Sequence, residues 1–391
     1  MMKRRTIVLG DLHIVRDTPS GVLDDLVGLI ESHRGTRIVI AGDLFDLSAD
    51  HPGEEKRDAL EGALAAQPRL VSVLREHVER DGELWLVGGN HDASVGEPAH
   101  AAEIAKALSL RPDAASRVRT SPWFIREGGL HLEHGHLYDP DNATVHPLMA
   151  NVRSLGVHFV EEFIAPTGAF RYLNANDGTP LKLLVSAFKW YGVRGPYVVY
   201  KYFDAAFRAL ASSGPFFAGA DEAVEGTARE AEFMRAHSVD ETLVKSMLEL
   251  RARPTMESLG DTFRRLYLDR VGATCALLGG VALAAAGKRN EALISLSAGA
   301  LAMSISWALG HDRYGGSVPD LLAKGAAKVV EKTGAKLVVL GHAHREHVDA
   351  TYANTGSFSF PRMPQGRPFL EIEGTEAFPT AVLRHVARSR A

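Results

Sequence analysis

The chain contains one cysteine, Cys275, among its 391 residues. A single thiol excludes a framework of intrachain disulfides and suits a reducing compartment. The chain also lacks an excess of positive charge, because its formal net charge is -4. Since no long basic stripe accompanies the polar motifs either, we expect no nucleic-acid partner. The remaining composition, 46% hydrophobic and 24% charged, is ordinary for a folded protein with a large core or two domains.

The first residues lack the pattern of a signal peptide. They combine basic residues with an apolar stretch, MMKRRTIVLGDLH, but Asp11 and His13 interrupt that stretch well before it reaches the length of a signal-peptide core. We interpret it as the first strand of the fold and expect a cytoplasmic location.

The chain does have a repeated pattern at the ends of its apolar runs. Residues 38–41 are β-branched or small, as in a buried parallel strand, and they end at Gly42 and Asp43. Four further runs end in polar groups: Asp11 and His13 after 4–10, Asn90, His91 and Asp92 after 83–89, His134 and His136 after 130–133, and His342 and His344 after 336–341. Chemistry in α/β sheets gathers at the carboxyl ends of the strands, so we expect these side chains to converge.

Segments with helical spacing separate these strands, so the sequence predicts an α/β fold with a layered β-sheet core flanked by helices. Residues 139–312 break the alternation, because they are mostly helical in pattern and contain no strand that ends in such a group. We therefore predict a core built from residues 1–138 and 313–391. A large helical insertion, or lid, at 139–312 interrupts it.

The converging side chains indicate a metal site. Carboxylate oxygens and imidazole nitrogens together suit Mn, Fe, Zn, Co or Ni ions better than calcium. Burying so many of these groups without cations would be costly. Asp43 lies at the end of the central strand, so it is the natural bridge between two ions.

The motifs resemble those of the calcineurin-like metallophosphoesterase family. They are, in order, GDLH at 10–13, GDLFD at 42–46, GNHD at 89–92, HGH at 134–136 and GHAH at 341–344. The resemblance implies two divalent metal ions, with manganese expected. It assigns Asp11, His13, Asp43 and His344 to one ion, and Asp43, Asn90, His134 and His342 to the other.

The resemblance also implies the reaction, which is hydrolysis of a phosphoester or pyrophosphate bond. A water between the two ions would be acidified to hydroxide and attack phosphorus in line. His91 would stabilise the transition state or protonate the leaving oxygen, and Asp92 would orient its ring. We expect Asp46 to support or cap neighbouring groups and Asn354 to order a turn near the ligands. His136 is left open between a supporting, a substrate-facing and a solvated residue.

The resemblance implies an anionic phosphoester as the substrate. The helical insertion is similar to the lid of bacterial UDP-2,3-diacylglucosamine pyrophosphatases, which favours a nucleotide-linked lipid as the substrate. The longer gap between His134 and His342, and His91 where many of those enzymes carry arginine, are departures from that group. The alternative within the same chemistry is a soluble phosphodiesterase or phosphatase that acts on nucleotides or other phosphoesters. The alternative of another class is a non-catalytic scaffold that binds metal without turnover.

Two parts of the insertion could contact a membrane. Residues 181–210 interleave lysine and arginine with aromatic residues, which suits anionic head groups but equally suits a helix pair whose aromatics form its own core. Residues 271–309 form two apolar runs around a basic turn. They fit a membrane hairpin, a shallow anchor, or a hairpin buried in the lid or in a dimer interface. Membrane contact would place the protein at the cytoplasmic face of the inner membrane.

Overall fold

The computed structural model describes residues 5–50, 56–149, 153–169, 180–217, 219–308 and 317–388. It divides into two compact units. The first unit contains Met1–Asn174, Ala218–Pro254 and Pro319–Ala391, and the second contains Ala175–Phe217 and Thr255–Val318. The predicted insertion at 139–312 is therefore not one unit, because its parts at 139–174 and 218–254 belong with the sheets.

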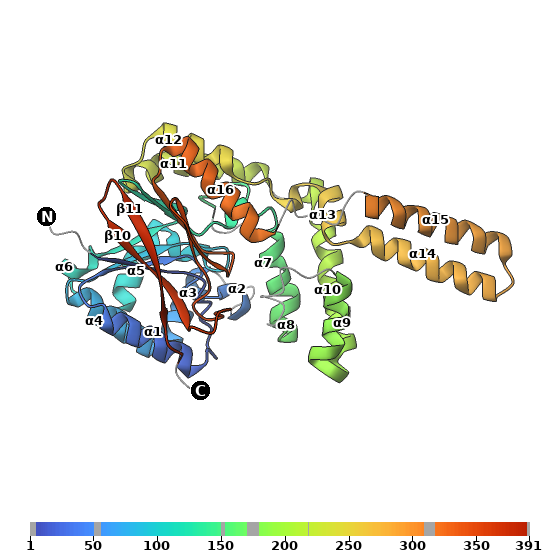
Figure 1. Cartoon of the computed structure of the whole chain (residues 1–391), viewed down its shortest axis with the longest axis horizontal. Helices are drawn as coiled ribbons and strands as arrows, with labels where there is room; N and C mark the ends of the chain where they lie inside the picture. Colours follow the sequence, from blue (N-terminus) through green and yellow to red (C-terminus); the bar gives the residue numbers. More distant parts are fainter. Residues whose placement is uncertain are drawn as a thin grey trace. The chain divides into compact units, whose positions relative to one another are not determined.

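The first unit contains two β-sheets (Figure 1). The six-stranded sheet has the order β11 (Pro379–Val386), β10 (Arg367–Gly374), β1 (Thr6–Leu9), β2 (Arg37–Ala41), β3 (Glu83–Val87) and β4 (Val118–Ser121). The five-stranded sheet has the order β5 (Phe124–Glu127), β6 (Leu130–Glu133), β7 (Leu337–Leu340), β9 (Tyr352–Thr355) and β8 (Glu346–Val348). Strands β1 to β4 are parallel, as are β6, β7 and β9. The predicted α/β class with a layered sheet core is confirmed.

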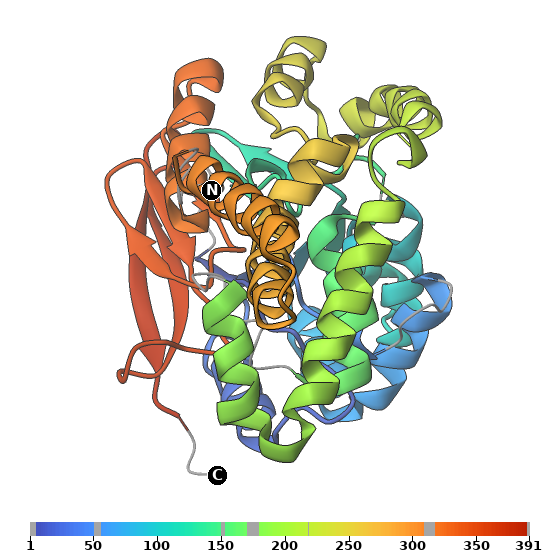
Figure 2. The same cartoon turned by 90° about the vertical axis from the view of Figure 1, so that its right-hand side faces the viewer.

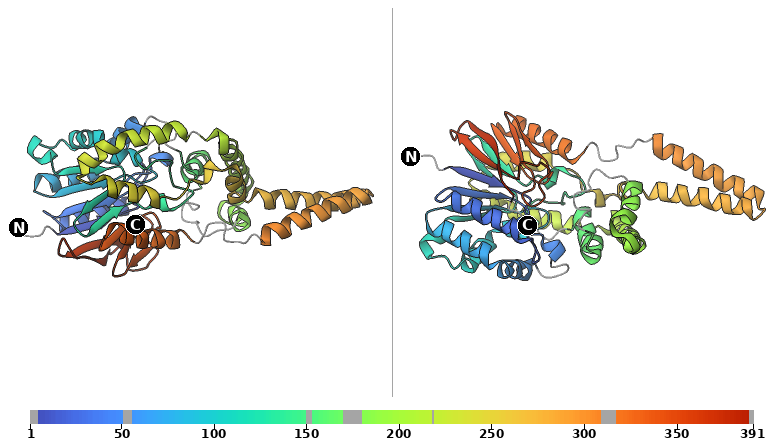
Figure 3. Two further views of the ribbon diagram at one scale, coloured as in Figure 1. Left: turned by 90° about the horizontal axis from the view of Figure 1, so that it is seen from above. Right: turned by 60° about the horizontal axis from the view of Figure 1, so that its bottom comes forward.

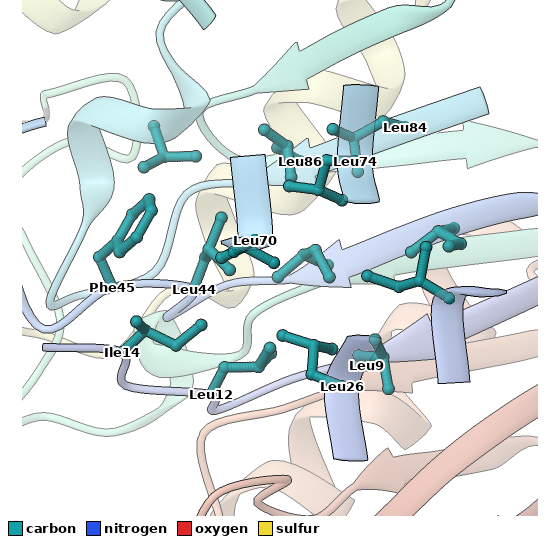
Figure 4. Packing of buried hydrophobic residues seen from close by; sticks show 14 of the residues in the cluster. Leu9, Leu12, Ile14, Leu26, Leu44, Phe45, Leu70, Leu74, Leu84 and Leu86 are labelled. Atoms are coloured by element: carbon teal, nitrogen blue, oxygen red, sulfur yellow. The ribbon is translucent and has the colours of Figure 1, made fainter. Parts of the chain in front are cut away.

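Both faces of the central strands are buried, because successive side chains of a strand point to opposite faces. On one face Leu9 and Ile40 join a core cluster with Leu26 from α1 (Ser20–Ser32) and Leu70 from α4 (Pro68–Glu79). Figure 4 shows Leu9, Leu26 and Leu70 within this cluster. On the other face the side chain of Val39 belongs to a second cluster, which includes residues of the five-stranded sheet. The two sheets therefore pack against each other, and the carboxyl ends of β1, β2 and β3 lie beside those of β6 and β7.

The first unit also contains eleven described α-helices, some of which cover the six-stranded sheet (Figures 1 and 2). They are α1 (Ser20–Ser32), α2 (Leu47–Asp50), α3 (Lys56–Ala66), α4 (Pro68–Glu79), α5 (Pro98–Ala107), α6 (Pro112–Ala115), α7 (Leu155–Phe159), α8 (Ala165–Thr167), α11 (Ala220–His237), α12 (Glu241–Leu250) and α16 (Val318–Thr333). A π-helical turn at Val160–Ile164 joins α7 to α8.

The described residues of the second unit are mainly helical. Its helices are α9 (Pro180–Tyr191), α10 (Gly195–Ala211), α13 (Leu259–Arg265), α14 (Leu268–Ala285) and α15 (Arg289–Ala308). Helices α14 and α15 run side by side as an antiparallel hairpin (Figure 3). The short segment 286–288 joins them.

Candidate metal centre

The strand ends that carry the predicted ligands share an unusual backbone conformation. Nine described non-glycine residues have positive φ, and five of them are Asp11, His13, Asp43, His342 and His344. A left-handed backbone costs a residue with a side chain of order 1 kcal/mol or more, so it persists where surrounding contacts hold it. These turns aim polar side chains from three different parts of the chain toward one place.

The first group of converging atoms comes from Asp11, His13 and His344, whose ligand atoms all lie within 4.8 Å of one another. His13 Nε2 is 3.0 Å from His344 Nε2, and His344 Nε2 is 3.2 Å from Asp11 Oδ1. Two imidazole nitrogens this close can coexist only if a proton or a cation lies between them. This donor set fits a divalent metal ion.

The second group comes from Asp11, Asp43 and His134. His134 Nδ1 donates to the carbonyl oxygen of Ala41 at 2.9 Å, which fixes the tautomer and leaves Nε2 as the ligand atom. His134 Nε2 then faces two further acceptors, Asp43 Oδ2 at 3.2 Å and Asn90 Oδ1 at 3.0 Å. Three acceptor atoms that face one another need a cation or an added proton, so this group also fits a metal ion.

Asp11 belongs to both groups. Asp43 belongs to the second group and also lies close to His13 of the first. Its Oδ2 atom is 3.6 Å from His13 Nε2 and 3.2 Å from His134 Nε2. Burial by itself would raise the pKa of Asp43, but the charges of His134 and His91 outweigh burial and hold that pKa well below its usual value. Asp43 is therefore an ionised carboxylate placed between two sets of ligands.

His91 is held by Asp46. His91 Nδ1 donates to Asp46 Oδ1 at 2.8 Å, and the backbone N–H of His91 donates to Asp43 Oδ1 at 3.0 Å. Burial lowers the pKa of His91, but Asp46 and Asp43 more than compensate and raise it to about 10. The His91 ring meets the His13 ring edge-on, with centroids 4.7 Å apart. His91 Nε2 makes no hydrogen bond to any described residue.

The predicted contact between Asp92 and the His91 ring is wrong. Asp92 Oδ1 accepts hydrogen bonds from the backbone N–H groups of Asp43 and Gly89 at 3.1 and 2.9 Å. Its Oδ2 accepts from the N–H of Phe45 at 3.0 Å. Asp92 therefore ties the turn after β2 to the turn after β3, and Asp46 orients the His91 ring instead.

Asn90 and His342 lie at the edge of the second group and are linked through a hydrogen-bonded pair, Asn142 and Asp139. The described residues contain a third group, His13, Asp46 and His91, and His342 is in none of the three. His342 Nε2 donates to Asp139 Oδ2 at 3.1 Å. Asn142 Nδ2 donates to the same Asp139 oxygen at 2.8 Å, and Asn142 Oδ1 accepts from Asn90 Nδ2 at 3.2 Å. A carboxylate on one ring nitrogen leaves the other as the available ligand, which for His342 is Nδ1.

Sequence reasoning missed Asp139 and Asn142. The prediction that Asp46 supports or caps neighbouring groups is confirmed, because Asp46 accepts hydrogen bonds from His91 Nδ1 and from the backbone N–H of Ala49. Nothing in the sequence around Asp139 and Asn142 distinguishes them from other polar residues of the predicted insertion. They became visible only when the structure placed them beside His342 and Asn90.

A small pocket adjoins the second group. It has a volume of about 20 Å³, and its lining includes Asn90, His136, Asn142 and Ser154. This is room for about one water-sized group. The His136 ring lies 5.4 Å from that of His134, and its Nδ1 is enclosed without a hydrogen-bond partner among the described residues. His136 therefore lines the space beside the ligands, and its role stays open.

The chain belongs to the calcineurin-like phosphoesterase family, whose family model matches residues 4–210. It is accordingly a phosphoester hydrolase, and its His/Asp groups suit the divalent metals that this family binds. The match includes the ends of β1, β2, β3 and β6, whereas β7 with His342 and His344 lies beyond it. No curated protein matches the chain.

Proposed function

We propose that this protein is a binuclear metal-dependent hydrolase of phosphoester or pyrophosphate bonds. The observation that carries the proposal is the position of Asp43, whose Oδ2 lies between the ligand atoms of His13 and His134. Asp11, His13, Asp43 and His344 would hold one ion. Asp43, Asn90, His134 and His342 would hold the other.

Two divalent cations, with manganese expected, would supply an acidified water and neutralise charge on the phosphate oxygens. Asp43 and Asp11 contribute buried negative charge that favours the cations. Asn90 is a neutral ligand, so it adds no repulsion toward an anionic substrate. Asp92 holds the turns that carry Asp43 and Asn90 through its three backbone hydrogen bonds.

His91 acts as the proton donor in this proposal. Its ion pair with Asp46 keeps it protonated at neutral pH. Because Nδ1 is engaged by Asp46, Nε2–H is the group that can reach the substrate. A protonated imidazole beside the ligands stabilises the charge that develops on the phosphate oxygens and protonates the leaving oxygen.

The proposed substrate is a nucleotide-linked lipid such as UDP-2,3-diacylglucosamine, cleaved at the cytoplasmic face of the inner membrane. The exposed surface of α9 and α10 favours a lipid-linked substrate. Four of its aromatic side chains are exposed, namely Phe188, Tyr197, Tyr200 and Phe207. The buried side chains of this pair are instead small ones such as Ala187 and Val198. These four aromatics therefore lie outside the core of the pair, and with the exposed Lys189 and Arg194 they suit an interface with anionic head groups.

Phosphorus NMR of the manganese-loaded protein tests the reaction and the substrate separately. The protein is incubated in detergent with UDP-2,3-diacylglucosamine and, in parallel, with bis(p-nitrophenyl) phosphate. Release of UMP and a lipid phosphate is the expected result. Turnover of the small diester alone would overturn the lipid substrate and leave a soluble phosphodiesterase or phosphatase. No turnover of either compound at full metal content would indicate a non-catalytic scaffold.

A further inference from the structure

Helices α14 and α15 pack on each other through a narrow seam. The buried residues of this seam recur every seven positions: Ala273 and Gly280 on α14, and Ala292, Gly299 and Ser306 on α15. A Cβ atom on Gly280 would lie 2.6 Å from Leu296 Cγ, and one on Gly299 would lie 2.9 Å from the Ala273 carbonyl oxygen. Small residues at such a seam allow the close helix packing that is typical of membrane proteins.

The rest of the hairpin surface is apolar and uncovered. In the apolar window of each helix only 17% of the residues are buried. Large exposed side chains lie on both helices: Leu278, Val281, Leu293, Ile294, Leu301 and Ile305. No charged residue occurs in 271–285 or 292–308. The other described residues therefore do not bury the hairpin. An exposed apolar surface of this extent is unfavourable in water.

Three hydroxyl side chains within the hairpin bond to its own backbone. Ser295 Oγ donates across the seam to the Ala276 carbonyl oxygen at 2.7 Å. Thr274 and Ser304 donate to carbonyl oxygens one turn earlier in their own helices, at 2.7 and 2.8 Å. Hydroxyl groups satisfied in this way need no water, which is the condition that hydrocarbon surroundings impose.

Each end of the hairpin is polar. The turn carries Lys288, Arg289 and Glu291, whereas the base carries Arg270 with two aromatic rings. The Arg270 guanidinium lies 5.0 Å from the Tyr267 ring centroid and 5.5 Å from that of Trp307. Aromatic and basic side chains gather in this way where a helix leaves the hydrocarbon for the head groups.

The distance between these ends matches a bilayer. Helices of 18 and 20 residues are about 27 and 30 Å long at a rise of 1.5 Å per residue, and the hydrocarbon core of a bilayer is about 30 Å thick. A second copy of the chain could cover one face of the hairpin, but the exposed apolar side chains surround the seam on both helices. A lipid bilayer, in contrast, would cover all of these faces at once.

We propose that the α14–α15 hairpin spans a lipid bilayer and anchors the chain there. The chain enters and leaves the hairpin at the base, so all other residues lie on one side of the membrane and the Lys288 turn reaches the opposite head groups. This anchor is argued from the hairpin alone and does not depend on the reaction or on the substrate.

The single cysteine provides the first test, because Cys275 is exposed on α14. The full chain is purified in detergent, reconstituted into phosphatidylglycerol and phosphatidylcholine vesicles, and treated with a water-soluble maleimide. We expect labelling of Cys275 to fall at least tenfold relative to the unfolded protein. An Ala107→Cys variant in a Cys275→Ala background carries its thiol on exposed α5 and should label fully. Equal labelling of Cys275 with and without unfolding would overturn the proposal.

The turn tests whether the hairpin spans. Asn290→Cys in the Cys275→Ala background should react with an impermeant maleimide in intact spheroplasts, whereas Ala107→Cys should react only after lysis. Reaction of both thiols only after lysis would contradict a spanning hairpin.

A matched pair of variants tests the apolar surface itself. The wild-type chain should remain in the membrane pellet after alkaline carbonate extraction. Leu293→Glu/Ile294→Glu places two charges on the exposed surface and should move most of the chain to the supernatant. Val224→Glu changes an equally exposed residue on α11, which is 72% exposed, and should stay in the pellet. Wild-type chain in the supernatant, or a lipid-free dimer in which Cys275 is protected, would overturn the bilayer as the occupant.

Discussion

Asp46 Oδ1 accepts a hydrogen bond from His91 Nδ1 at 2.8 Å. The two residues follow different strands of the six-stranded sheet, β2 and β3. Asp46 is buried, and His91 and His13 hold its pKa below the usual value although burial opposes them. The pair is therefore ionised on both sides, and it determines which histidine nitrogen is left for the substrate.

Asp46→Asn should lower the pKa of His91, because Asp46 is the strongest of the charges that raise it. Turnover of bis(p-nitrophenyl) phosphate should then fall, and the alkaline limb of the pH–rate profile should move to lower pH by one unit or more. An Asp24→Asn variant removes a carboxylate on α1 that pairs with Arg69 instead of a histidine, and it should leave the profile unchanged. An unshifted alkaline limb in Asp46→Asn would show that the pair does not control the titrating group.

His91→Ala should reduce turnover by about 10²- to 10⁴-fold, the usual contribution of a general acid. Metal content should remain close to the wild-type value, because the proposed ligand sets do not include His91. Steady-state kinetics and elemental analysis of the same sample measure both quantities. His347→Ala, on the exposed part of β8, is the matched control. Unchanged hydrolysis in His91→Ala would remove this residue from the reaction.

Asp139→Ala should lower the affinity for the second metal ion by about 10- to 100-fold. Loss of a carboxylate that orients a ligating histidine usually has an effect of this size. The reason is that Asp139 accepts from His342 Nε2 and also holds Asn142 beside Asn90. Titration of the metal-free protein with manganese, followed by calorimetry, should show one site weakened and one preserved. Asp113→Ala on the exposed α6 should leave both sites intact. Equal weakening of both would indicate a general loss of structure.

His237 should make the protein less stable in mild acid. Burial and the nearby charge of Arg119 lower the pKa of His237 to about 4. The unfolded chain, with a pKa near 6.5, therefore binds more protons than the folded chain between pH 6.5 and 4. The contribution of His237 to stability is complete above pH 6.5 and falls as pH drops through this window, by up to about 3 kcal/mol.

His237→Leu should flatten that part of the stability curve, because leucine fills the same space without titrating. Chemical denaturation at pH 7.0 and pH 4.5 measures the change, with the wild-type chain as reference. A wild-type chain that loses no more stability than the variant would contradict the lowered pKa.

The sequence was sufficient to place the ligands at one sheet edge because the signal is local. Each ligand group directly follows an apolar strand, so strand ends alone brought together Asp11, Asp43 and His134. The prediction that Asn354 orders a turn is confirmed, since its Nδ2 donates to the Gly341 carbonyl oxygen at 2.6 Å and its Oδ1 accepts from the N–H of Gly356 at 3.1 Å.

The direction of a side chain after the strand end could not be predicted in the same way. Asp92 follows His91 in the GNHD motif and Asp46 ends the separate GDLFD motif, but which of the two contacts the His91 ring depends on turn geometry that no periodicity encodes. The partners of Asn90 and His342 lie in residues 139–142, where sequence reasoning placed the start of an insertion. The two apolar runs in the sequence likewise identified the α14–α15 hairpin. They could not show whether other residues of the chain cover its surface.

The number and coupling of bound metal ions test the central claim most directly. The wild-type chain loaded with manganese should bind two ions, and its electron paramagnetic resonance spectrum should show an exchange-coupled pair because Asp43 is shared. Asp43→Asn should lose the coupled signal and most of the second ion. A single bound ion in the wild type, or two ions with no coupling, would contradict the binuclear centre.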